Sequence, residues 1–233
     1  MSNERQVAQF QSRASTAADQ ARASHLRDEM QDGHLPKGEL AVLYLRGKSP
    51  LLTYSTPPGT EFEGDGEFVS IHGVILVENC DPRKVALQRT YRSDTGRYIL
   101  PAELLRSALS KTGRILTGLK GAQLSNTCET YNPRIWDLID SELSLLELDQ
   151  ENPWEIDVKV GRRPRDRSAV PVIRPRFTNW ALKVWIWFNP DEVNLETIHS
   201  LFSQTGMKVG LGSLSPASRN IYGTFKVISW RQL

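Results

Sequence analysis

Six arginines lie within the fifteen residues from Arg162 to Arg176. The planar guanidinium group of arginine donates paired hydrogen bonds to a phosphate and also stacks on nucleobases, whereas lysine offers only a point charge. Gly161 and Pro164 favour a break between two strand-like runs. The sequence therefore predicts a protruding basic hairpin or loop that binds a polyanion. The residues assigned to this role are Arg162, Arg163, Arg165, Arg167, Arg174 and Arg176.

The charge of the whole chain hides this cluster. The 233 residues carry a formal net charge of only +2, which by itself indicates no particular partner. Eight acids and no lysine or arginine lie between Asp137 and Asp157, and seven basic residues with one acid lie between Val158 and Arg176. In the alternative interpretation the arginines pair with this acidic block, within one chain or between subunits. Surface ion pairs contribute only ~0–1 kcal/mol each, which favours the phosphate interpretation.

A second candidate surface lies on the third expected strand of the core. Its alternation sends Lys183, Trp185 and Trp187 to one face and the aliphatic residues to the other. Tyr44 and Arg46, on the first expected strand, are placed to lie beside them. Aromatic and basic side chains on an open sheet form a stacking platform for single-stranded bases. The alternative, which the large area of tryptophan favours, is that these rings are buried under an insertion or in a subunit contact.

The elements that must position these groups follow from hydrophobic periodicity and from the placing of glycine and proline. Strands are expected at 41–46, 143–148, 180–188 and 221–228, helices at 101–117 and about 191–205, and a hairpin around 64–66 with a return strand at 67–77. Gly206 is expected to end the second helix. The order predicts an α+β, ferredoxin-like (RRM-like) βαββαβ core, with long insertions after strand 1 and between strands 2 and 3.

The chain divides unevenly. Residues 1–38 are expected to form a polar tail or an isolated helix, and residues 39–233 a single ferredoxin-like domain with a basic insertion at about 155–176. No apolar run is long enough for a membrane-spanning helix, and the first residues lack the apolar stretch of a secretory signal. The two cysteines fit a reducing compartment. We expect a cytoplasmic protein of a bacterial cell, including a phage-infected one, with no membrane partner.

Several short motifs resemble the RAMP superfamily, the ferredoxin-like RNA-binding subunits that form the backbone of CRISPR effector complexes. The stretch Gly206-Met-Lys-Val-Gly210-Leu-Gly212, followed by Tyr222-Gly223-Thr-Phe225, is similar to that family's C-terminal glycine loop. The segment Tyr98–Leu109 resembles its proline-led helix, in which a basic residue follows two apolar ones. Arg46–Leu52 and Arg174–Trp180 are similar to segments of uncharacterised phage and prophage proteins of the same superfamily.

The resemblance implies an extended basic insertion, the thumb of the backbone subunits, at Arg162–Arg167. It also implies head-to-tail assembly of identical subunits along a nucleic-acid strand. The usual run of glycines is thinned here to Gly210, Gly212 and Gly223. This departure weakens the case for a close approach of the loop backbone to phosphate.

The expected function is non-catalytic binding of single-stranded RNA, in preference to single-stranded DNA, by a homo-oligomer or filament that needs no metal or cofactor. Further contacts are expected from Arg46, Lys48, Arg106 and Arg114. Two alternatives stay open. Some members of the superfamily cut RNA with a histidine, and His72 would then be the catalytic residue of a metal-independent endoribonuclease. A phage module for protein–protein interaction or counter-defence, mimicking a CRISPR subunit, would instead bind the basic insertion to an acidic neighbour.

Overall fold

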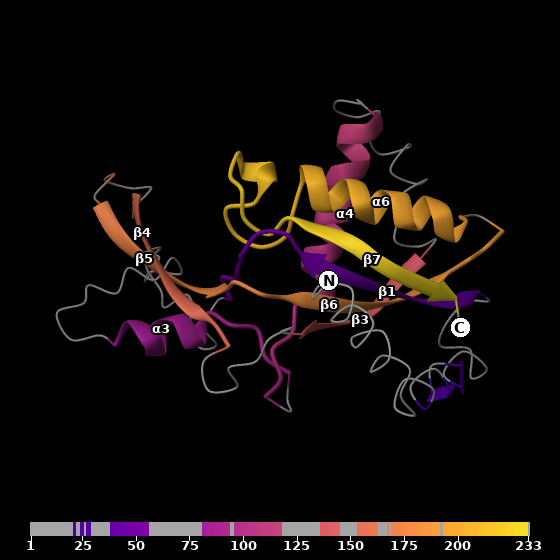
Figure 1. Cartoon of the computed structure of the whole chain (residues 1–233), viewed down its shortest axis with the longest axis horizontal. Coiled ribbons are helices and arrows are strands. Elements are labelled where there is room, and N and C mark those ends of the chain that lie inside the picture. The colour runs from indigo at the N-terminus through magenta and orange to yellow at the C-terminus, as the bar shows by residue number, and fades with distance from the viewer. Residues whose placement is uncertain are drawn as a thin grey trace, which may run out of the picture.

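The structure is a computed structural model of the chain. It describes residues 38–55, 81–93, 96–117, 136–144, 153–162, 167, 169–191 and 193–232, together with residues 21, 24, 25, 27 and 28. The described elements are helices and antiparallel strands, arranged as two sheets (Figure 1). The expected α+β class is therefore confirmed. None of the described helices has the length and apolarity needed to span a bilayer.

The larger sheet has four strands in the order β3-β6-β1-β7, and every neighbouring pair is antiparallel. Its members are β1 (Glu39–Gly47), β3 (Trp136–Ser144), β6 (Ala181–Phe188) and β7 (Phe225–Gln232). The two central strands, β1 and β6, are nearly continuous apolar runs and are buried along most of their length. Strands of this kind need cover on both faces, which explains why they occupy the middle of the sheet.

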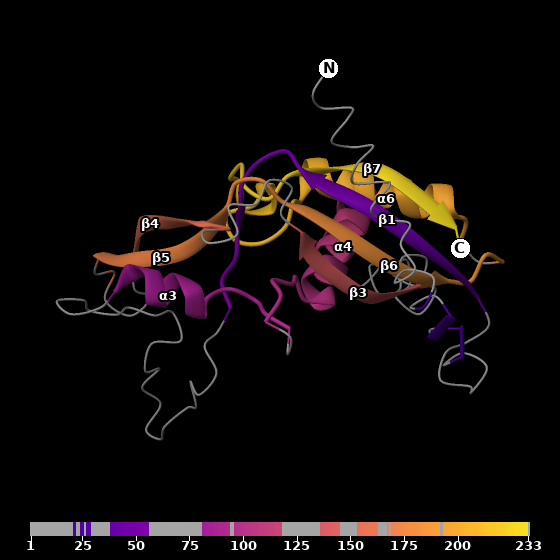
Figure 2. The ribbon, with the colours of Figure 1, turned by 60° about the horizontal axis from the view of Figure 1, so that its bottom comes forward.

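One face of this sheet is covered by helices α4 (Ala102–Thr117) and α6 (Leu195–Lys208), as Figure 2 shows. The bounds of α4 agree with the expected helix, because Pro101 precedes an apolar stripe that packs on the sheet. The first turn of α6 is capped by Asn194, whose side-chain oxygen accepts a hydrogen bond from the Thr197 amide (2.8 Å). The buried hydroxyl groups of Thr112 and Thr205 lie 2.8 Å apart and join the two helices.

Three expected boundaries were wrong. The second core strand, expected at 143–148, begins at Trp136, because pairing along the whole length of β6 selects the segment Trp136–Ser144; residues 145–148 lie outside the described residues. Helix α6 continues through Gly206, which lies so close to β7 that an added Cβ would overlap the Phe225 carbonyl. The glycine serves this close approach and does not end the helix. The last strand begins at Phe225, four residues later than expected, because Gly223 has a positive φ of 70° and keeps the preceding residues in a turn.

The smaller sheet has the order β2-β5-β4 and carries the predicted basic insertion as a hairpin. Its elements are β2 (Leu51–Leu52), β4 (Glu155–Arg162) and β5 (Ala169–Phe177), with helix α3 (Pro82–Gln88) packed on one face. Figure 1 shows the β4–β5 hairpin projecting beyond one end of the larger sheet. The hairpin expected around residues 64–66 and the strand expected at 67–77 lie outside the described residues.

Only residues 178–180 separate β5 from β6, so the hairpin continues directly into a central strand of the larger sheet. Trp180 fixes this connection. Its ring is buried, its indole N–H donates to the Ser49 carbonyl (2.8 Å), and its carbonyl accepts from the Gly47 amide (2.9 Å). The two sheets are therefore joined by a short segment that is anchored by the buried and hydrogen-bonded Trp180.

Candidate nucleic-acid interface

One face of the β4–β5 hairpin is charged. The antiparallel register sets Glu155 opposite Arg176 and Asp157 opposite Arg174. Directly opposite residues of paired strands share a face, and so do alternate residues of one strand, which adds Lys159 to the same group. The other face is apolar, and α3 packs against its base through Ile173 and Phe177. The basic residues Lys159, Arg174 and Arg176 therefore lie on a single side of the hairpin.

Arg174 is half-buried in a small cluster of charged and aromatic groups. The Cζ atom of Arg89 lies 4.6 Å from the centre of the Tyr54 ring, and that of Arg174 lies 5.7 Å from it. Burial lowers the pKa of the Arg174 guanidinium, Asp157 and Tyr54 oppose this shift, and Arg89 adds to it. Arginine nevertheless stays protonated in proteins. Arg89 is only 2% exposed and its guanidinium donates to the Ile173 carbonyl, so Arg174 is the guanidinium of this cluster that an anion in solution could reach.

At the base of the hairpin, arginines lie near residues of the acidic block, as the alternative interpretation expects. The Arg176 Nε lies 3.9 Å from a Glu155 carboxylate oxygen, and Asp157 lies near Arg174. The Arg176 and Glu155 side chains are 38% and 65% exposed, so this long contact contributes little stability. At the tip, Arg167 is exposed. The side chains of Arg162, Arg163 and Arg165 lie outside the described residues, and their role stays a prediction.

Lys159 connects the hairpin to the segment 209–224, which we call the glycine loop. Its ammonium group donates a hydrogen bond to the Tyr222 hydroxyl (2.9 Å) and lies 4.2 Å from the centre of the same ring. A cation over an aromatic face gains ~0.5–1 kcal/mol at an exposed site. This contact places the charged face of the hairpin next to the glycine loop.

The glycine loop is packed tightly on the segment that follows β1. The Ser213 amide donates to the Leu52 carbonyl and the Gly223 amide donates to the Pro50 carbonyl, both at 2.8 Å. Gly212 and Gly223 both have positive φ, and an added Cβ would overlap the Leu52 and Leu211 carbonyl oxygens respectively. Chain packing alone therefore requires these glycines, and their presence does not by itself indicate a ligand.

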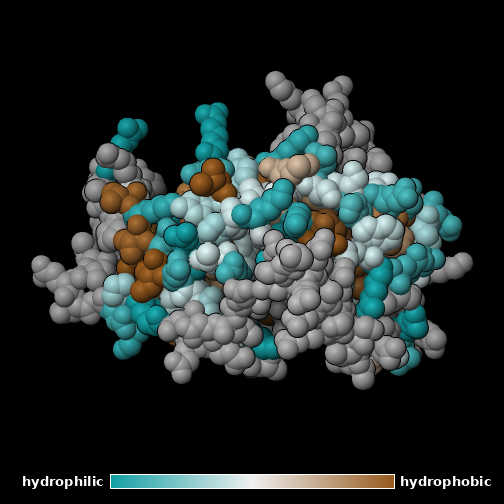
Figure 3. Space-filling view, in the orientation of Figure 1, coloured by the Kyte–Doolittle hydropathy of each residue, from teal (hydrophilic) through white to brown (hydrophobic). Residues whose placement is uncertain are grey.

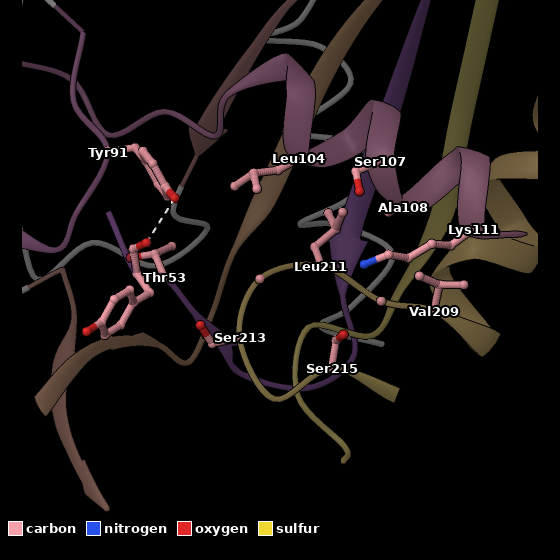
Figure 4. A pocket seen from close by; sticks show the side chains of 13 residues that line it. Thr53, Tyr91, Leu104, Ser107, Ala108, Lys111, Val209, Leu211, Ser213 and Ser215 are labelled. Atoms are coloured by element: carbon pink, nitrogen blue, oxygen red, sulfur yellow. Dashed lines mark hydrogen bonds between the residues drawn. The ribbon is translucent and has the colours of Figure 1, made fainter. Parts of the chain in front are cut away.

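A pocket of about 190 Å³ lies between the glycine loop, α4 and residues 53–54 (Figure 4). Its size suits one small polar group and is below the range of about 300–1,000 Å³ that holds a drug-sized ligand. The lining residues are Thr53, Tyr54, Tyr91, Leu104, Ser107, Ala108, Lys111, Val209, Gly210, Leu211, Gly212, Ser213 and Ser215. Tyr54 belongs both to this pocket and to the Arg89–Arg174 cluster, which makes the two regions contiguous.

The pocket offers hydrogen-bond donors at its rim above an apolar floor. Figure 4 shows the Lys111 ammonium directed toward the glycine loop, with Ser107 on the next turn of the same helix. The Tyr91 hydroxyl donates to the Tyr54 carbonyl (3.1 Å), and burial raises the pKa of Tyr91, so the phenol is neutral at neutral pH. A positive charge and several hydroxyl groups suit a phosphate or a ribose.

The remaining predicted site residues are dispersed. The Lys48 side chain is exposed. Lys48 lies beside the glycine loop, where its amide donates a hydrogen bond to the Thr224 carbonyl (2.8 Å). Arg46 lies on β1, where its Cα pairs with those of Ala181 and Lys226. Arg106 is half-buried on α4, and Arg114 belongs to the same helix with its side chain outside the described residues.

Four residues of this region were missed: Tyr54, Arg89, Lys111 and Lys159. A signal existed for two of them. Lys111 follows Ser107 by four positions and therefore shares its helix face. Lys159 alternates with Asp157 on β4 and therefore shares its strand face. Tyr54 and Arg89 carry no local pattern, because they meet only through the tertiary packing of distant segments.

The expected aromatic platform is not open. Its neighbours were predicted correctly, since Lys183 pairs with Tyr44 and its ammonium lies 5.0 Å from the centre of the Trp185 ring. However, Tyr44, Trp185 and Trp187 are each at most 3% exposed. The buried alternative is therefore confirmed, and these rings offer no surface on which bases could stack.

The histidines contribute nothing to the described part of this interface. His199 is half-buried on α6, with its ring centre 6.0 Å from that of Trp230. His72 lies outside the described residues. Among the residues that the structure describes, no three His, Cys, Asp or Glu side chains gather as a metal site would require.

Comparison with known proteins identifies the fold. No protein-family model matches this sequence, and no curated protein is a close enough relative to match. A similar solved structure is a chain of the Type III-B Cmr-beta bound to cognate target RNA, studied by cryo-EM. Its TM-score is 0.57 and its sequence identity 11%, and the match covers 94% of this chain and 68% of that chain. At this identity the likeness shows the fold alone.

Proposed function

We propose that this protein binds single-stranded RNA along a path from the β4–β5 hairpin to the pocket beside α4, without catalysing a reaction on it. The observation that carries the proposal is the contiguity of three features. Arg174 lies over the Tyr54 ring, Tyr54 lines the pocket, and Lys111 stands at the pocket rim. Basic groups spaced along a groove and interleaved with aromatic rings suit a single strand of alternating phosphates and bases.

The arrangement of the larger sheet supports a ferredoxin-like core. Its strands and helices follow the chain order strand, helix, strand, strand, helix, strand, and β1 and β6 are central. The smaller sheet then comprises two insertions, one after the first core strand and one between the second and third. This core, the RAMP-like fold and the glycine loop together favour RNA over other polyanions.

The pocket chemistry supports binding over catalysis. General acid–base catalysis needs a side chain whose pKa lies near the working pH. Burial raises the pKa of Tyr91 further from neutral pH, and the Tyr91 hydroxyl donates its proton to the Tyr54 carbonyl. The hydroxyl groups of Ser107 and Ser213 are suited to a ribose 2′-hydroxyl, which distinguishes RNA from DNA.

The proposal includes binding of successive copies along one strand, as the sequence motifs imply. The number of chains bound is then expected to rise in steps with oligonucleotide length. Light scattering of complexes with RNAs of increasing length would measure this. A single chain bound at every length would contradict this part and leave the binding site unaffected.

Lys111→Ala is expected to weaken binding of a short labelled single-stranded RNA about tenfold, since a hydrogen bond to a charged group contributes roughly 1.5 kcal/mol. The matched control is Lys208→Ala, which removes the same exposed charge from the last turn of α6. Lys208 precedes Val209 in the chain but does not itself line the pocket. Fluorescence anisotropy with RNA and with DNA of the same sequence would measure both variants. Equal losses in the two variants would contradict the assignment of the pocket.

A further inference from the structure

Strand β4 forms an edge of the smaller sheet. In the order β2-β5-β4 it pairs with β5 on one side, and no described strand pairs with its other side. The pairing with β5 runs from Glu155 to Arg162 without a bulge, and β4 contains no proline. Proteins usually protect such an edge with a bulge, a proline or a covering element, because its free N–H and C=O groups are a template for another strand.

The same strand exposes a row of apolar side chains. Ile156, Val158 and Val160 alternate along one face of β4 and are 39%, 57% and 79% exposed. Helix α3 packs at the base of this face, where Ile173 is buried, but it leaves Val158 and Val160 uncovered. Figure 3 shows apolar surface over the hairpin, at the left of the view. An open edge with an apolar face is a typical protein-binding surface.

The sequence of β4 is complementary to itself in one antiparallel register. A two-fold axis at Val158 would set this residue against its own copy, and Ile156 against the partner subunit's Val160. In the same register Asp157 lies opposite the partner subunit's Lys159, which joins opposite charges. Moving the axis by one residue would set either Asp157 or Lys159 against its own copy, and like charges directly opposite are destabilising. Charge therefore selects the axis at Val158.

We infer that two copies of this chain pair through their β4 strands, forming a two-fold dimer with one continuous six-stranded sheet. The contact uses the same patch on both subunits, so it closes at two copies. It differs in this respect from head-to-tail assembly along RNA, and it requires no nucleic acid. The two-fold axis runs perpendicular to the sheet, so the charged faces of both hairpins lie on the same side.

The first test measures the mass of the nucleic-acid-free protein by size-exclusion chromatography with light scattering over a range of concentrations. The wild type is expected at twice the 26.3 kDa of one chain. Val158→Lys sets two ammonium groups face to face at the axis and is expected to raise the dimer dissociation constant by at least about tenfold. Met207→Lys, which adds the same charge at an exposed apolar residue of α6, is expected to remain dimeric.

A monomeric wild type would overturn the inference, and so would a Val158→Lys variant that stays dimeric. RNA affinity measured on the same samples keeps this inference distinct from the proposed function. Val158 lies on the face opposite Lys159, Arg174 and Arg176, so the Val158→Lys chain is expected to bind RNA as the Met207→Lys chain does. If the wild-type protein does not bind RNA, that result contradicts the proposed function and leaves the dimer inference unaffected.

The second test fixes the register. With Cys80 and Cys128 changed to serine, Val158→Cys is expected to form a disulfide-linked dimer on mild oxidation, because the Cα atoms of residues that face each other across paired strands lie within the distance that a disulfide spans. Val160→Cys faces the partner subunit's Ile156 and is expected to stay unlinked. Equal cross-linking of the two variants on a denaturing gel, or none in a sample that scatters as a dimer, would overturn the proposed pairing.

Discussion

Replacing Arg162, Arg163, Arg165 and Arg167 together by alanine is expected to weaken binding of single-stranded RNA by about a thousandfold, without unfolding the protein. Each phosphate contact is assigned ~1 kcal/mol, and four such contacts amount to about three factors of ten. The dependence of the logarithm of the binding constant on the logarithm of salt concentration is expected to become shallower by about three, since each single-strand phosphate contributes ~0.7. Fluorescence anisotropy titrations at several salt concentrations would measure both quantities.

The control variant must lose four positive charges while keeping the arginines at the hairpin tip. Changing Lys84, Arg97, Lys208 and Lys226 to alanine does this, because all four are exposed and none belongs to the β4–β5 hairpin or the pocket lining. Its affinity is expected to fall only slightly, through the weaker long-range field of the chain. An equal loss in the two quadruple variants would assign the effect to net charge. Unchanged affinity in the variant that lacks Arg162, Arg163, Arg165 and Arg167 would show that the hairpin tip does not contact RNA.

Gly223→Ala is expected to lower the free energy of unfolding by about 3 kcal/mol or more, and RNA affinity with it. The residue has a φ of 70°, and a methyl group there would overlap the Leu211 carbonyl, so the glycine loop would have to move. Backbone strain of this kind costs ~1–3 kcal/mol, and forced overpacking costs a similar amount. Unfolding in urea, followed by circular dichroism, would measure the loss.

Gly96 provides the matched control for this prediction. Its φ is 79°, but an added Cβ would meet no atom within 4 Å. Gly96→Ala therefore imposes the left-handed strain without the collision, and it is expected to cost only about 1 kcal/mol. The difference between the two variants isolates the close approach of the loop segments. Equal losses would show that the loop yields to the added methyl group.

The sequence was sufficient to place elements whose signals are local. Helix α4 has a proline start and an apolar stripe, and β6 is an apolar run interrupted only by Lys183, so both were located within a residue or two. Strand β3 was misplaced because its bounds are set by the length of its partner β6. Gly206 was misassigned because a glycine that ends a helix and a glycine that lets a strand approach look the same in one sequence.

The interface divides in the same way. A concentration of arginines between two strand-like runs predicted the hairpin, and alternation places Arg174 and Arg176 on one face. The pocket could not be predicted, since it is lined by residues 53–54, by α4 and by residues 209–215, which are far apart in the chain. The burial of Trp185 also depends on tertiary packing, which alternation on a strand does not reveal.

The short connection from β5 to β6 through Trp180 bears on the affinity that the proposed interface would have for single-stranded RNA. If the hairpin were attached through a flexible linker, a ligand that contacted both the hairpin and the larger sheet would have to order it, at a cost in conformational entropy. Here the anchored indole ring has already removed that freedom during folding. In the proposed complex this anchoring would lower the entropic cost of binding, so that more of the attraction between the cations and RNA would appear as affinity.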